Sequence, residues 1–405
     1  MNIVGINISH HSSSCLIKNG KIVYFSEEER FSRKKSHSIN YHDLKFYGIE
    51  SLRKHVTTID HLVFATYGRE GSVQGAPEYA FRDIDLIDNN PEELYRKYLD
   101  YSHKGIEYVV NDRVIIYSIL KQLRESGIKV KNVVFNPEEH HIHHAYNSLL
   151  FSRFNEAAIL VMDGGGSFNF DEYYDLSDFL ETESVFREKE SIYSYSNKQV
   201  QKVFSHSSPS FVVPRDKEIS IRRGKRYFSH TLSAGDLFNA VRRIMGFGIN
   251  NEGKVMGLSS HYQDEFPEDL KESWFYNHND EIVSKPDLLE KLHSLPYDFK
   301  VSETNLFYPS MLARKLQIES ERLATHLICK ASELTGTTNV ILSGGYFMNC
   351  VNNFKYVQNT KHISIEVDPI PYDAGASLGA ANQLHMKLTG SSIEKPDNLF
   401  LSNKY

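Results

Sequence analysis

Cysteine is scarce in this 405-residue chain, which has only three cysteines and one tryptophan. The cysteines are too few and too scattered for a disulfide framework or a thiolate metal cage. Long apolar runs are also missing, since the stretch 157–162 is far shorter than the ~20 residues of a membrane helix. Residues 1–14 lack the basic and apolar segments of a secretion signal. We therefore expect a protein of the reducing cytoplasm, without a membrane partner.

A large excess of charge of one sign is absent as well. Lys and Arg together number 46 and Asp and Glu 52, which gives a formal net charge of −6. Because this charge does not attract polyanions globally, a nucleic acid would need a local basic patch. A hydrophobic fraction of 40% suits a folded protein, and the length allows two or three domain-sized units.

The patterns that are present are typical of an α/β protein. A β-rich stretch covers 2–7, and Asn19-Gly20 between later apolar runs predicts a hairpin, because both residues tolerate positive φ. Residues 42–150 alternate helix-like stretches with short apolar strands. An apolar stripe with helical spacing runs from 312 to 334 and predicts a long buried helix.

These patterns divide the chain into lobes. The predicted first α/β lobe covers 1–155 and contains the N-terminal hairpin and a histidine-rich helix. The predicted second α/β lobe covers 156–390, and residues 391–405 form a tail. Because residues 168–230 show no clear periodicity, we interpret them as a segment inserted in the second lobe.

The histidine-rich helix is the sharpest chemical signal, since four of the 19 histidines fall within residues 140–144. Residues 136–139, Asn-Pro-Glu-Glu, provide the cap, the proline and the acidic residue that begin a helix. His140 and His144 then become neighbours at i, i+4, where two imidazoles can bind one metal. The helix is not of the H-E-x-x-H type, because His141 occupies the position where that motif has its glutamate base. We interpret the segment as a metal site; the alternative is a solvated helix start with some packed histidines.

Two aspartates could complete such a site. Asp163 follows the apolar strand 157–162, and Asp373 lies on a loop before a helix of small residues. Two histidines and two carboxylates suit Fe(II), Mn(II) or Zn(II), and the sequence leaves this choice open. Glycines after Asp163 let backbone N–H groups approach an oxyanion, and the following serine adds a hydroxyl. The candidate phosphate loop therefore consists of Asp163, Gly164, Gly165, Gly166 and Ser167.

A second glycine-rich turn, 343–350, follows a strand near residue 339 and should open a helix. The first N–H groups of a helix and its positive dipole end suit a nucleotide phosphate or ribose, although a purely structural turn is the alternative. Near the N-terminus, His10 lies in a hairpin turn. The basic run that ends at Lys35 offers charges of the kind that clamp phosphates. Both could also be solvated surface.

Together these segments resemble the NodU/CmcH family of O-carbamoyltransferases. Seven motifs match in order along nearly the whole chain: G-I-N-x-x-H, E-E-R-F-S-R-x-K, H-H-x-x-H-A, D-G-x-G, G-K-x-M-G-L, G-G-x-x-x-N-C and D-x-G-x-x-x-G-A-A. The resemblance implies an actin-like ATPase (ribonuclease-H-like) fold of two α/β lobes.

The resemblance also implies roles for single residues. His10 matches the family's proposed catalytic base, and Lys35 matches an adenylate contact that offsets developing charge. The other implied adenylate contacts are Asp163 to Ser167, Gly345 and Asn349. The implied metal ligands, with Fe(II) favoured, are His140, His144, Asp163 and Asp373. This chain departs from the family at two positions: it has His11 where the family usually has aspartate, and Ser36 where the family usually has histidine. These differences concern the acceptor pocket more than the metal site.

The implied activity is the transfer of a carbamoyl group to an acceptor hydroxyl. In the family the donor is carbamoyladenylate, which a following YrdC-like domain makes from ATP and carbamoyl phosphate. This chain stops about where that domain would begin, so either a separate YrdC-like protein supplies the donor or the chain is a truncation. Two other hypotheses stay open: a metal- and nucleotide-binding scaffold subunit, and an actin-fold sugar kinase.

The acceptor is the open part of this prediction. Residues 222–228 mix basic and aromatic side chains, which suit phosphates and stacked bases, although a solvated loop is the alternative. The hypothesis is that the acceptor is a nucleotide or a hydroxymethylated base in DNA, against a sugar or an antibiotic-like alcohol. The oligomeric state is not predicted.

Overall fold

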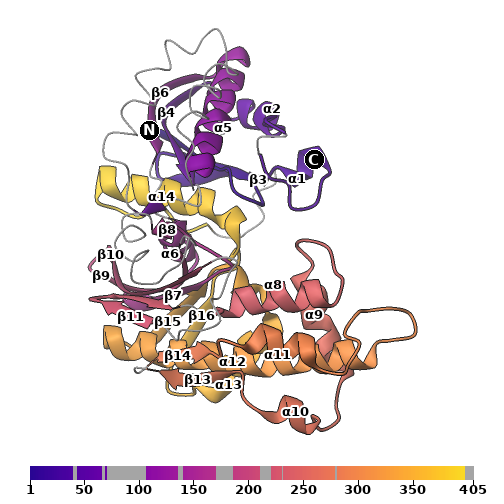
Figure 1. Cartoon of the computed structure of the whole chain (residues 1–405). Coiled ribbons are helices and arrows are strands. Elements are labelled where there is room, and N and C mark those ends of the chain that lie inside the picture. Colours follow the sequence, from indigo (N-terminus) through magenta and orange to yellow (C-terminus); the bar gives the residue numbers. More distant parts are fainter. Residues whose placement is uncertain are drawn as a thin grey trace. The chain divides into compact units, whose positions relative to one another are not determined.

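A computed structural model describes residues 1–39, 43–65, 69–70, 106–135, 140–169, 186–209, 220–229, 231–278 and 281–396. The backbone contacts divide the chain into two compact units (Figure 1). Unit 1 comprises residues 1–152, 167–174 and 369–405, and unit 2 comprises 153–166 and 175–368. None of the helices within the described ranges is long and apolar enough to cross a membrane.

Unit 1 is built on a mixed sheet of five strands. Their order is β3 (Lys21–Glu27), β2 (Ser13–Lys18), β1 (Asn2–Asn7), β4 (Thr58–Ala65) and β6 (Lys129–Phe135). The first three pair antiparallel, whereas β4 and β6 continue from β1 in parallel. Asn19 and Gly20 have φ values of 51° and 79°, so the predicted Asn-Gly hairpin is confirmed.

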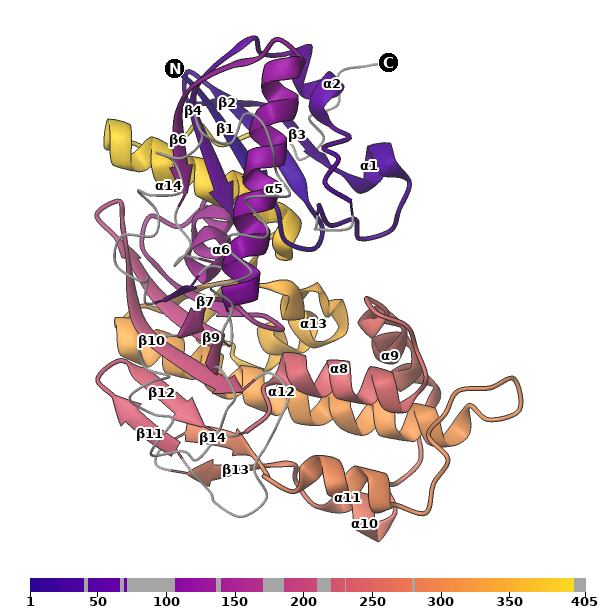
Figure 2. The same ribbon diagram turned by 45° about the horizontal axis from the view of Figure 1, so that its top comes forward.

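Helices cover both faces of this sheet because side chains on both faces are apolar. Val4 and Ile6 of β1 belong to the core beneath α5 (Ile106–Glu125), which Figure 2 shows crossing the strands. Ile3 packs on the opposite side, against α14 (Ala376–Thr389). The other elements of unit 1 are α1 (Glu29–Ser32), α2 (Ile49–Arg53), α6 (His140–Ser148), the 3-10 turn η5 (Asp373–Gly375) and the paired short strands β5 (Arg69–Glu70) and β8 (Phe168–Asn169).

Unit 2 repeats the same strand order. Its sheet runs β10 (Gln199–Pro209), β9 (Phe186–Ser196), β7 (Ala157–Met162), β15 (Asn339–Ser343) and β16 (Ser364–Val367), extended beyond β10 by β12 (Arg226–Ser229) and β11 (Ser220–Arg223). β7, β9 and β10 pair antiparallel, and β15 and β16 continue from β7 in parallel. This order, found in both units, is that of the actin-like ATPase (ribonuclease-H-like) fold. The predicted fold class is confirmed.

The core of unit 2 lies between this sheet and the 29-residue helix α12 (Phe307–Thr335). Leu316, Leu323 and Leu327 are buried as predicted, whereas Leu334 in the last turn is exposed. The other elements are α8 (Ala234–Ile244), α9 (Glu252–Leu258), η3 (Ser259–His261), α10 (Glu268–Lys271), β13 (Phe275–His278), β14 (Glu281–Ser284), α11 (Leu288–Ser294), η4 (Gly345–Met348) and α13 (Cys350–Asn359).

Two segments differ from the sequence-based division into lobes. Residues 369–405 belong to unit 1, because α14 packs against β1 and α6, whereas the prediction divided them between the second lobe and a tail. The predicted insertion 168–230 contributes β9 to β12 to the sheet of unit 2; its residues 170–185, 210–219 and 230 lie outside the described ranges. The sequence pattern did not predict β9 as a strand, because its buried positions include the charged residues Glu188 to Glu190 in place of apolar ones.

Candidate active site

α6 is a helix whose polar residues lie in the interior. All four of its histidines are fully buried: His140, His141, His143 and His144. His140 and His144 are one turn apart, and their Nε2 atoms are 3.3 Å from each other. Two nitrogen ligands that each lie ~2.1 Å from one metal ion are separated by about this distance. The two rings are therefore placed as ligands of one metal would be.

Asp373 supplies a carboxylate beside these two rings. It lies in η5, is 1% exposed, and its Oδ1 is 3.7 Å from Nε2 of both His140 and His144. Among the described residues, no donor makes a normal hydrogen bond to this Oδ1. The three donor atoms all lie within 4.8 Å of one another. A buried carboxylate oxygen of this kind, next to two imidazole nitrogens, fits a bound divalent cation.

The ligands come from distant parts of the chain because α6 and α14 approach each other closely. A Cβ at Gly379 of α14 would collide with the carbonyl oxygen of His143. A Cβ at Gly375 would collide with the side chain of Asn147. The two glycines of the D-x-G-x-x-x-G motif therefore let the two helix backbones come near enough for their side chains to meet.

The loop after β1 holds the other oxygen of Asp373. Ser9 Oγ donates a hydrogen bond to Oδ2 at 2.7 Å, and His10 Nδ1 lies 3.2 Å from the same oxygen. Asn7 Oδ1 accepts a hydrogen bond from the N–H of Ser9 at 3.1 Å, which fixes the serine backbone. It also lies 2.7 Å from Ser9 Oγ, whose single proton can bond to only one of the two oxygens at a time. When Nδ1–H of His10 points to Asp373, its Nε2 carries the lone pair, and 39% of this side chain is exposed.

The electrostatics of the site favour an ionised aspartate. Burial raises the pKa of the Asp373 carboxyl, but nearby His10 and His140 outweigh this effect and hold the pKa well below its usual range. Burial and the charges of its histidine neighbours lower the pKa of His143 to about 3, so this ring is neutral. An ionised carboxylate is the state that metal ligation requires.

Replacing Ser9 by alanine tests whether this loop positions the carboxylate. The change removes the Oγ that donates to Asp373, so the carboxylate should rotate more freely. We expect the affinity for Mn²⁺, measured by isothermal titration calorimetry, to fall about tenfold, the lower end of what the loss of an outer-shell partner costs. Ser14→Ala is the control, because Ser14 is a buried serine of β2 outside the loop. An equal loss of affinity in both variants would count against the positioning role.

Two glycine-rich turns pack together in unit 2, at the carboxyl ends of β7 and β15. Asp163 is buried directly after β7, and Gly164 beside it is exposed. Gly344 has a φ of 96°, and a Cβ there would collide with the carbonyl oxygen of Met162. A Cβ at Gly345 would lie 3.0 Å from Asp163 Oδ1. Because α/β folds bind ligands at the carboxyl ends of their strands, these turns suit a nucleotide phosphate.

Asn349 makes more contacts within the protein than its sequence context indicates. Its Oδ1 accepts hydrogen bonds from Gln317 Nε2 at 2.7 Å and from the N–H of Asn352 at 3.2 Å. Its Nδ2 donates to Gln317 Oε1 at 3.1 Å. Asn349 is thus the N-cap of α13 and joins it to α12. Its contact with an adenylate stays a prediction.

Lys35 and Ser167 lie in unit 1. Lys35 is exposed in the turn after α1, where Glu29 Oε2 accepts a hydrogen bond from the N–H of Ser36 at 2.8 Å. Ser167 Oγ accepts a hydrogen bond from the N–H of His140 at 3.2 Å, at the start of α6. The cap predicted over 136–139 lies outside the described residues. Sequence reasoning missed the contact of Ser167 with α6, because nothing local connects the two.

The predicted site residues therefore fall into two groups. His10, His140, His144 and Asp373 come together in unit 1. The predicted members from unit 2 are Asp163, Gly164, Gly165, Gly166, Gly345 and Asn349. That Asp163 is a fourth metal ligand stays a prediction. Sequence reasoning missed Ser9 as a partner of Asp373, although it directly precedes His10.

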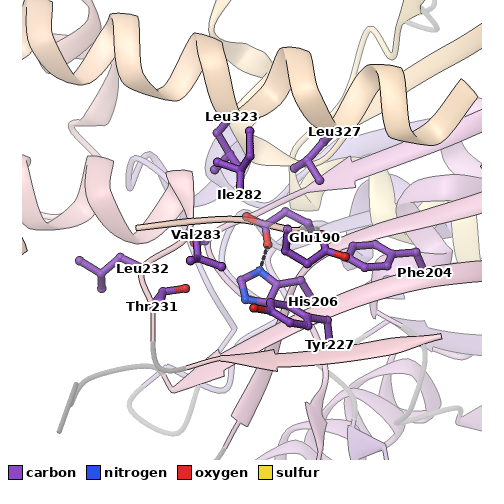
Figure 3. A pocket seen from close by; sticks show the side chains of 12 residues that line it. Glu190, Phe204, His206, Tyr227, Thr231, Leu232, Ile282, Val283, Leu323 and Leu327 are labelled. Carbon is purple, nitrogen blue, oxygen red and sulfur yellow. Dashed lines mark hydrogen bonds and ion pairs between the residues drawn. The ribbon is translucent and has the colours of Figure 1, made fainter. Parts of the chain in front are cut away.

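A second polar cluster lies inside unit 2, in a small cavity with apolar walls (Figure 3). Glu190 Oε2 is 2.6 Å from His206 Nδ1, and His206 Nε2 is 2.7 Å from Ser229 Oγ. Leu323 and Leu327 of α12 line the opposite side. These polar groups connect β9, β10 and β12 and satisfy one another, as buried polar groups in a sheet must.

The basic segment 222–228 belongs to the hairpin of β11 and β12. Arg222 forms an ion pair with Glu281 and lies 5.7 Å from the centroid of the Tyr227 ring. Lys225 Nζ donates a hydrogen bond to the carbonyl oxygen of Lys202 at 3.2 Å. The charge of Arg222 is therefore balanced within unit 2. Nucleic-acid binding by this segment stays a prediction.

Comparison with known proteins adds to this geometry. The chain matches the family described as "Carbamoyltransferase N-terminus" over residues 2–382. It belongs to this family. The resemblance inferred from the seven motifs is thereby confirmed, and the carbamoyltransferase N-terminus match includes every residue of the candidate site.

Two relatives of this carbamoyltransferase family member are similar along nearly the whole chain. The nodulation protein NolNO of Sinorhizobium fredii is 25% identical over 396 residues, which cover 95% of this chain and 47% of the relative. The uncharacterized protein sll1178 of Synechocystis sp. is 26% identical over 432 residues, which cover 98% of this chain and 59% of the relative. The chain thus spans about half the length of the curated relatives it matches.

Solved structures that resemble the chain have low sequence identity. Full-length HypF in its phosphate- and nucleotide-bound form is 14% identical, with a TM-score of 0.49, over 96% of this chain and 56% of HypF. A ROK family protein from Streptococcus pneumoniae TIGR4 in complex with sucrose is 11% identical, with a TM-score of 0.43, over 96% of this chain and 99% of that protein.

Proposed function

We propose that this chain is the metal- and nucleotide-binding part of an O-carbamoyltransferase. In this proposal a carbamoyl group moves from carbamoyladenylate to an acceptor hydroxyl, and an O-carbamate and AMP are the products. The observation that carries the proposal is the cluster of His140, His144 and Asp373 with His10 beside it, in a member of the carbamoyltransferase N-terminus family. Similarity to a nodulation protein supports the proposal but does not identify the acceptor.

The cluster fits a divalent metal, and Fe(II) is the ion that we propose. Two imidazoles and one carboxylate form the donor set typical of non-haem Fe(II) sites, although Mn(II) and Zn(II) accept similar ligands. We also propose Asp163 as a fourth ligand, because its D-G-x-G motif matches the family that has a metal ligand at this position. When bound, the metal would polarise an oxygen of the donor's carbonyl or phosphate group.

The donor's phosphate is proposed to bind at the glycine-rich turns of unit 2. Backbone N–H groups of the turn 163–166 and of Gly345 are the proposed hydrogen-bond donors, because glycines let an oxyanion approach closely. Ser167 and Asn349 are kept as predicted contacts. Lys35 would offset the negative charge that develops on the departing AMP.

His10 is the proposed general base. Its Nδ1 faces the carboxylate of Asp373, which leaves Nε2 as the basic nitrogen of the neutral ring. In the proposed step, Nε2 takes the proton of the acceptor hydroxyl while the hydroxyl oxygen bonds to the carbamoyl carbon. The bond between this carbon and the phosphate oxygen breaks, and AMP leaves. Asp373 stabilises the imidazolium that forms.

The donor and the acceptor are the remaining parts of the proposal. We propose that a YrdC-like protein makes carbamoyladenylate from ATP and carbamoyl phosphate. The acceptor classes to compare are sugar-type alcohols and hydroxymethylated nucleobases or nucleotides.

The test is a transfer assay read by mass spectrometry. The chain is incubated with ATP, carbamoyl phosphate, a YrdC-like protein and a panel of sugars, nucleosides and hydroxymethylated bases. We expect one acceptor to gain one carbamoyl group. His10→Asn, assayed with the metal site saturated, should lower the rate by about 10²- to 10⁴-fold, the usual contribution of a general base, while ATP affinity stays unchanged. His293→Asn, an exposed histidine of α11, is the control.

The other outcomes separate the alternatives. A phosphorylated product would identify a kinase. Metal and ATP binding without any modified acceptor, even with chemically prepared carbamoyladenylate, would favour a scaffold subunit. A wild-type rate for His10→Asn would remove His10 as the base.

A further inference from the structure

Two positively charged side chains lie next to the glycine turn 164–166 of unit 2, and the proposed transfer reaction does not use them. Arg187 and Lys189 lie on β9, the antiparallel neighbour of β7. The Lys189 side chain is 1% exposed. Burying an ammonium group is unfavourable unless its charge is compensated, and an apolar residue of similar size often gives equal stability. The contacts that these two side chains make indicate why cations are used there.

Both cations donate hydrogen bonds to carbonyl oxygens of the turn. Lys189 Nζ donates to the carbonyl oxygen of Gly164 at 3.2 Å. The Arg187 guanidinium donates to the carbonyl oxygens of Gly165 at 2.7 Å and Gly166 at 3.3 Å. A guanidinium has the planar fork that reaches two oxygens at once. The three glycine carbonyls are thus held by two side chains.

The backbone of β9 fixes the same turn from its two ends. The N–H of Asp163 donates to the carbonyl oxygen of Lys189 at 3.1 Å, and the N–H of Gly166 donates to that of Glu188 at 2.7 Å. A Cβ at Gly165 would lie 2.7 Å from Arg187 Cζ, so the glycine is needed for the guanidinium to lie this close. The conformation of the turn therefore depends on β9.

This arrangement sets the direction of a backbone amide. In a trans peptide the C=O of one residue and the N–H of the next point in opposite directions. Because the carbonyl of Gly164 points to Lys189, the N–H of Gly165 points away from that cation. The two cations also offset the negative charge of the carbonyl oxygens that they contact. The turn as a whole is therefore less negative, which favours binding of an anion by its N–H groups.

The first turn of α8 completes the support. Lys189 Nζ donates to Asp236 Oδ1 at 2.7 Å, and Asp236 forms a capping box with Ser233 at the start of this 11-residue helix. A Cβ at Gly235 would lie 2.8 Å from the carbonyl oxygen of Asp163. α8 therefore begins directly against the turn, and its positive dipole end adds to the charge of the two cations.

We propose that Arg187 and Lys189 are positioning residues that hold Gly164, Gly165 and Gly166 in the conformation that binds a nucleotide phosphate. They act through the turn and do not need to touch the phosphate. The identity of the ligand rests on the proposed function, whereas the effect of the two cations on the turn is a property of the protein alone.

The test uses full-length protein and a control from the same pair of strands. Arg187→Met and Lys189→Met remove each cation and keep much of its length, and Arg187→Lys keeps the charge without the fork. Lys202→Met is the control, because Lys202 also pairs with a buried charge of the same two strands, Glu188 Oε1 at 2.6 Å. Hydrogen exchange reports on residues 158–169, and isothermal titration calorimetry gives the Kd for ATP.

We expect faster exchange in the turn of both methionine variants and wild-type exchange in Lys202→Met. The Kd for ATP should rise about tenfold in Arg187→Met and Lys189→Met, because a hydrogen bond that involves a charged group typically contributes about this much. Arg187→Lys should recover part of this loss, because one carbonyl can still be reached. A wild-type circular dichroism spectrum of each variant shows that the protein is folded.

Wild-type exchange in the turn of both methionine variants would overturn the proposal. So would an equal loss of ATP affinity in Lys202→Met, because that loss would follow from general destabilisation of the sheet. If the wild-type protein binds no ATP, the proposed nucleotide site fails, and the exchange data alone still decide whether the two cations position the turn.

Discussion

Alanine at His140 or at His144 should abolish both metal binding and the proposed carbamoyl transfer. Each ring supplies one of the three donor atoms that converge in unit 1, and alanine offers no replacement. The loss of an outer-shell partner lowers metal affinity by about 10- to 100-fold, so the loss of a ligand should lower it by on the order of 100-fold or more. Metal analysis by mass spectrometry, after loading with Fe(II) and desalting, should find almost no ion.

The control for this experiment is His362→Ala, which removes an exposed histidine of unit 2 and should leave the metal content unchanged. Thermal unfolding of the metal-free proteins shows whether a variant has lost more than its ligand. Wild-type metal content in a folded His140→Ala or His144→Ala protein would show that this ring is not a ligand. The proposed chemistry would then lose its basis.

Gly379→Ala should disrupt the candidate site without changing any polar residue. The added methyl group would collide with the carbonyl oxygen of His143, a backbone atom of α6 that cannot rotate away. α14 and α6 would have to separate, and Asp373 would move away from His140. Overpacking of this kind costs about 3 kcal/mol, at the upper end of the usual range. Urea unfolding should show the loss of stability, and Mn²⁺ titration a parallel loss of affinity.

Gly257→Ala is the matched control. This glycine lies in α9, and an added Cβ would meet no atom within 4 Å. Alanine is the better helix former by roughly 0.8–1 kcal/mol, so this variant should be as stable as the wild type or slightly more so. If Gly379→Ala unfolds at the wild-type urea concentration, close packing of α6 on α14 does not determine the site.

Several features were predictable because they depend on neighbours in the sequence. Asn19-Gly20 prescribes a tight hairpin, whatever surrounds it. The spacing of His140 and His144 places both rings on one face of any helix that contains them. The apolar stripe of α12 requires one buried face, and the structure buries it.

Other features could not be predicted from local patterns. β9 does not read as a strand because Glu188, Lys189 and Glu190 occupy buried positions. Their charges are balanced by partners on other elements, such as Asp236 on α8 for Lys189 and His206 on β10 for Glu190. Only these partners show that the residues belong to a sheet and not to an inserted loop.

The sequence by itself determined the local geometry of this protein: the hairpin, the facing histidines, the glycines at strand ends and the motif order that identifies its family. Only the tertiary structure decided which of these pieces meet. Asp373 reaches His140 because the C-terminal part of the chain returns to unit 1 and glycines let α14 pack on α6. Such contacts between distant residues arise from the packing of a whole core, and no short window of sequence contains that information.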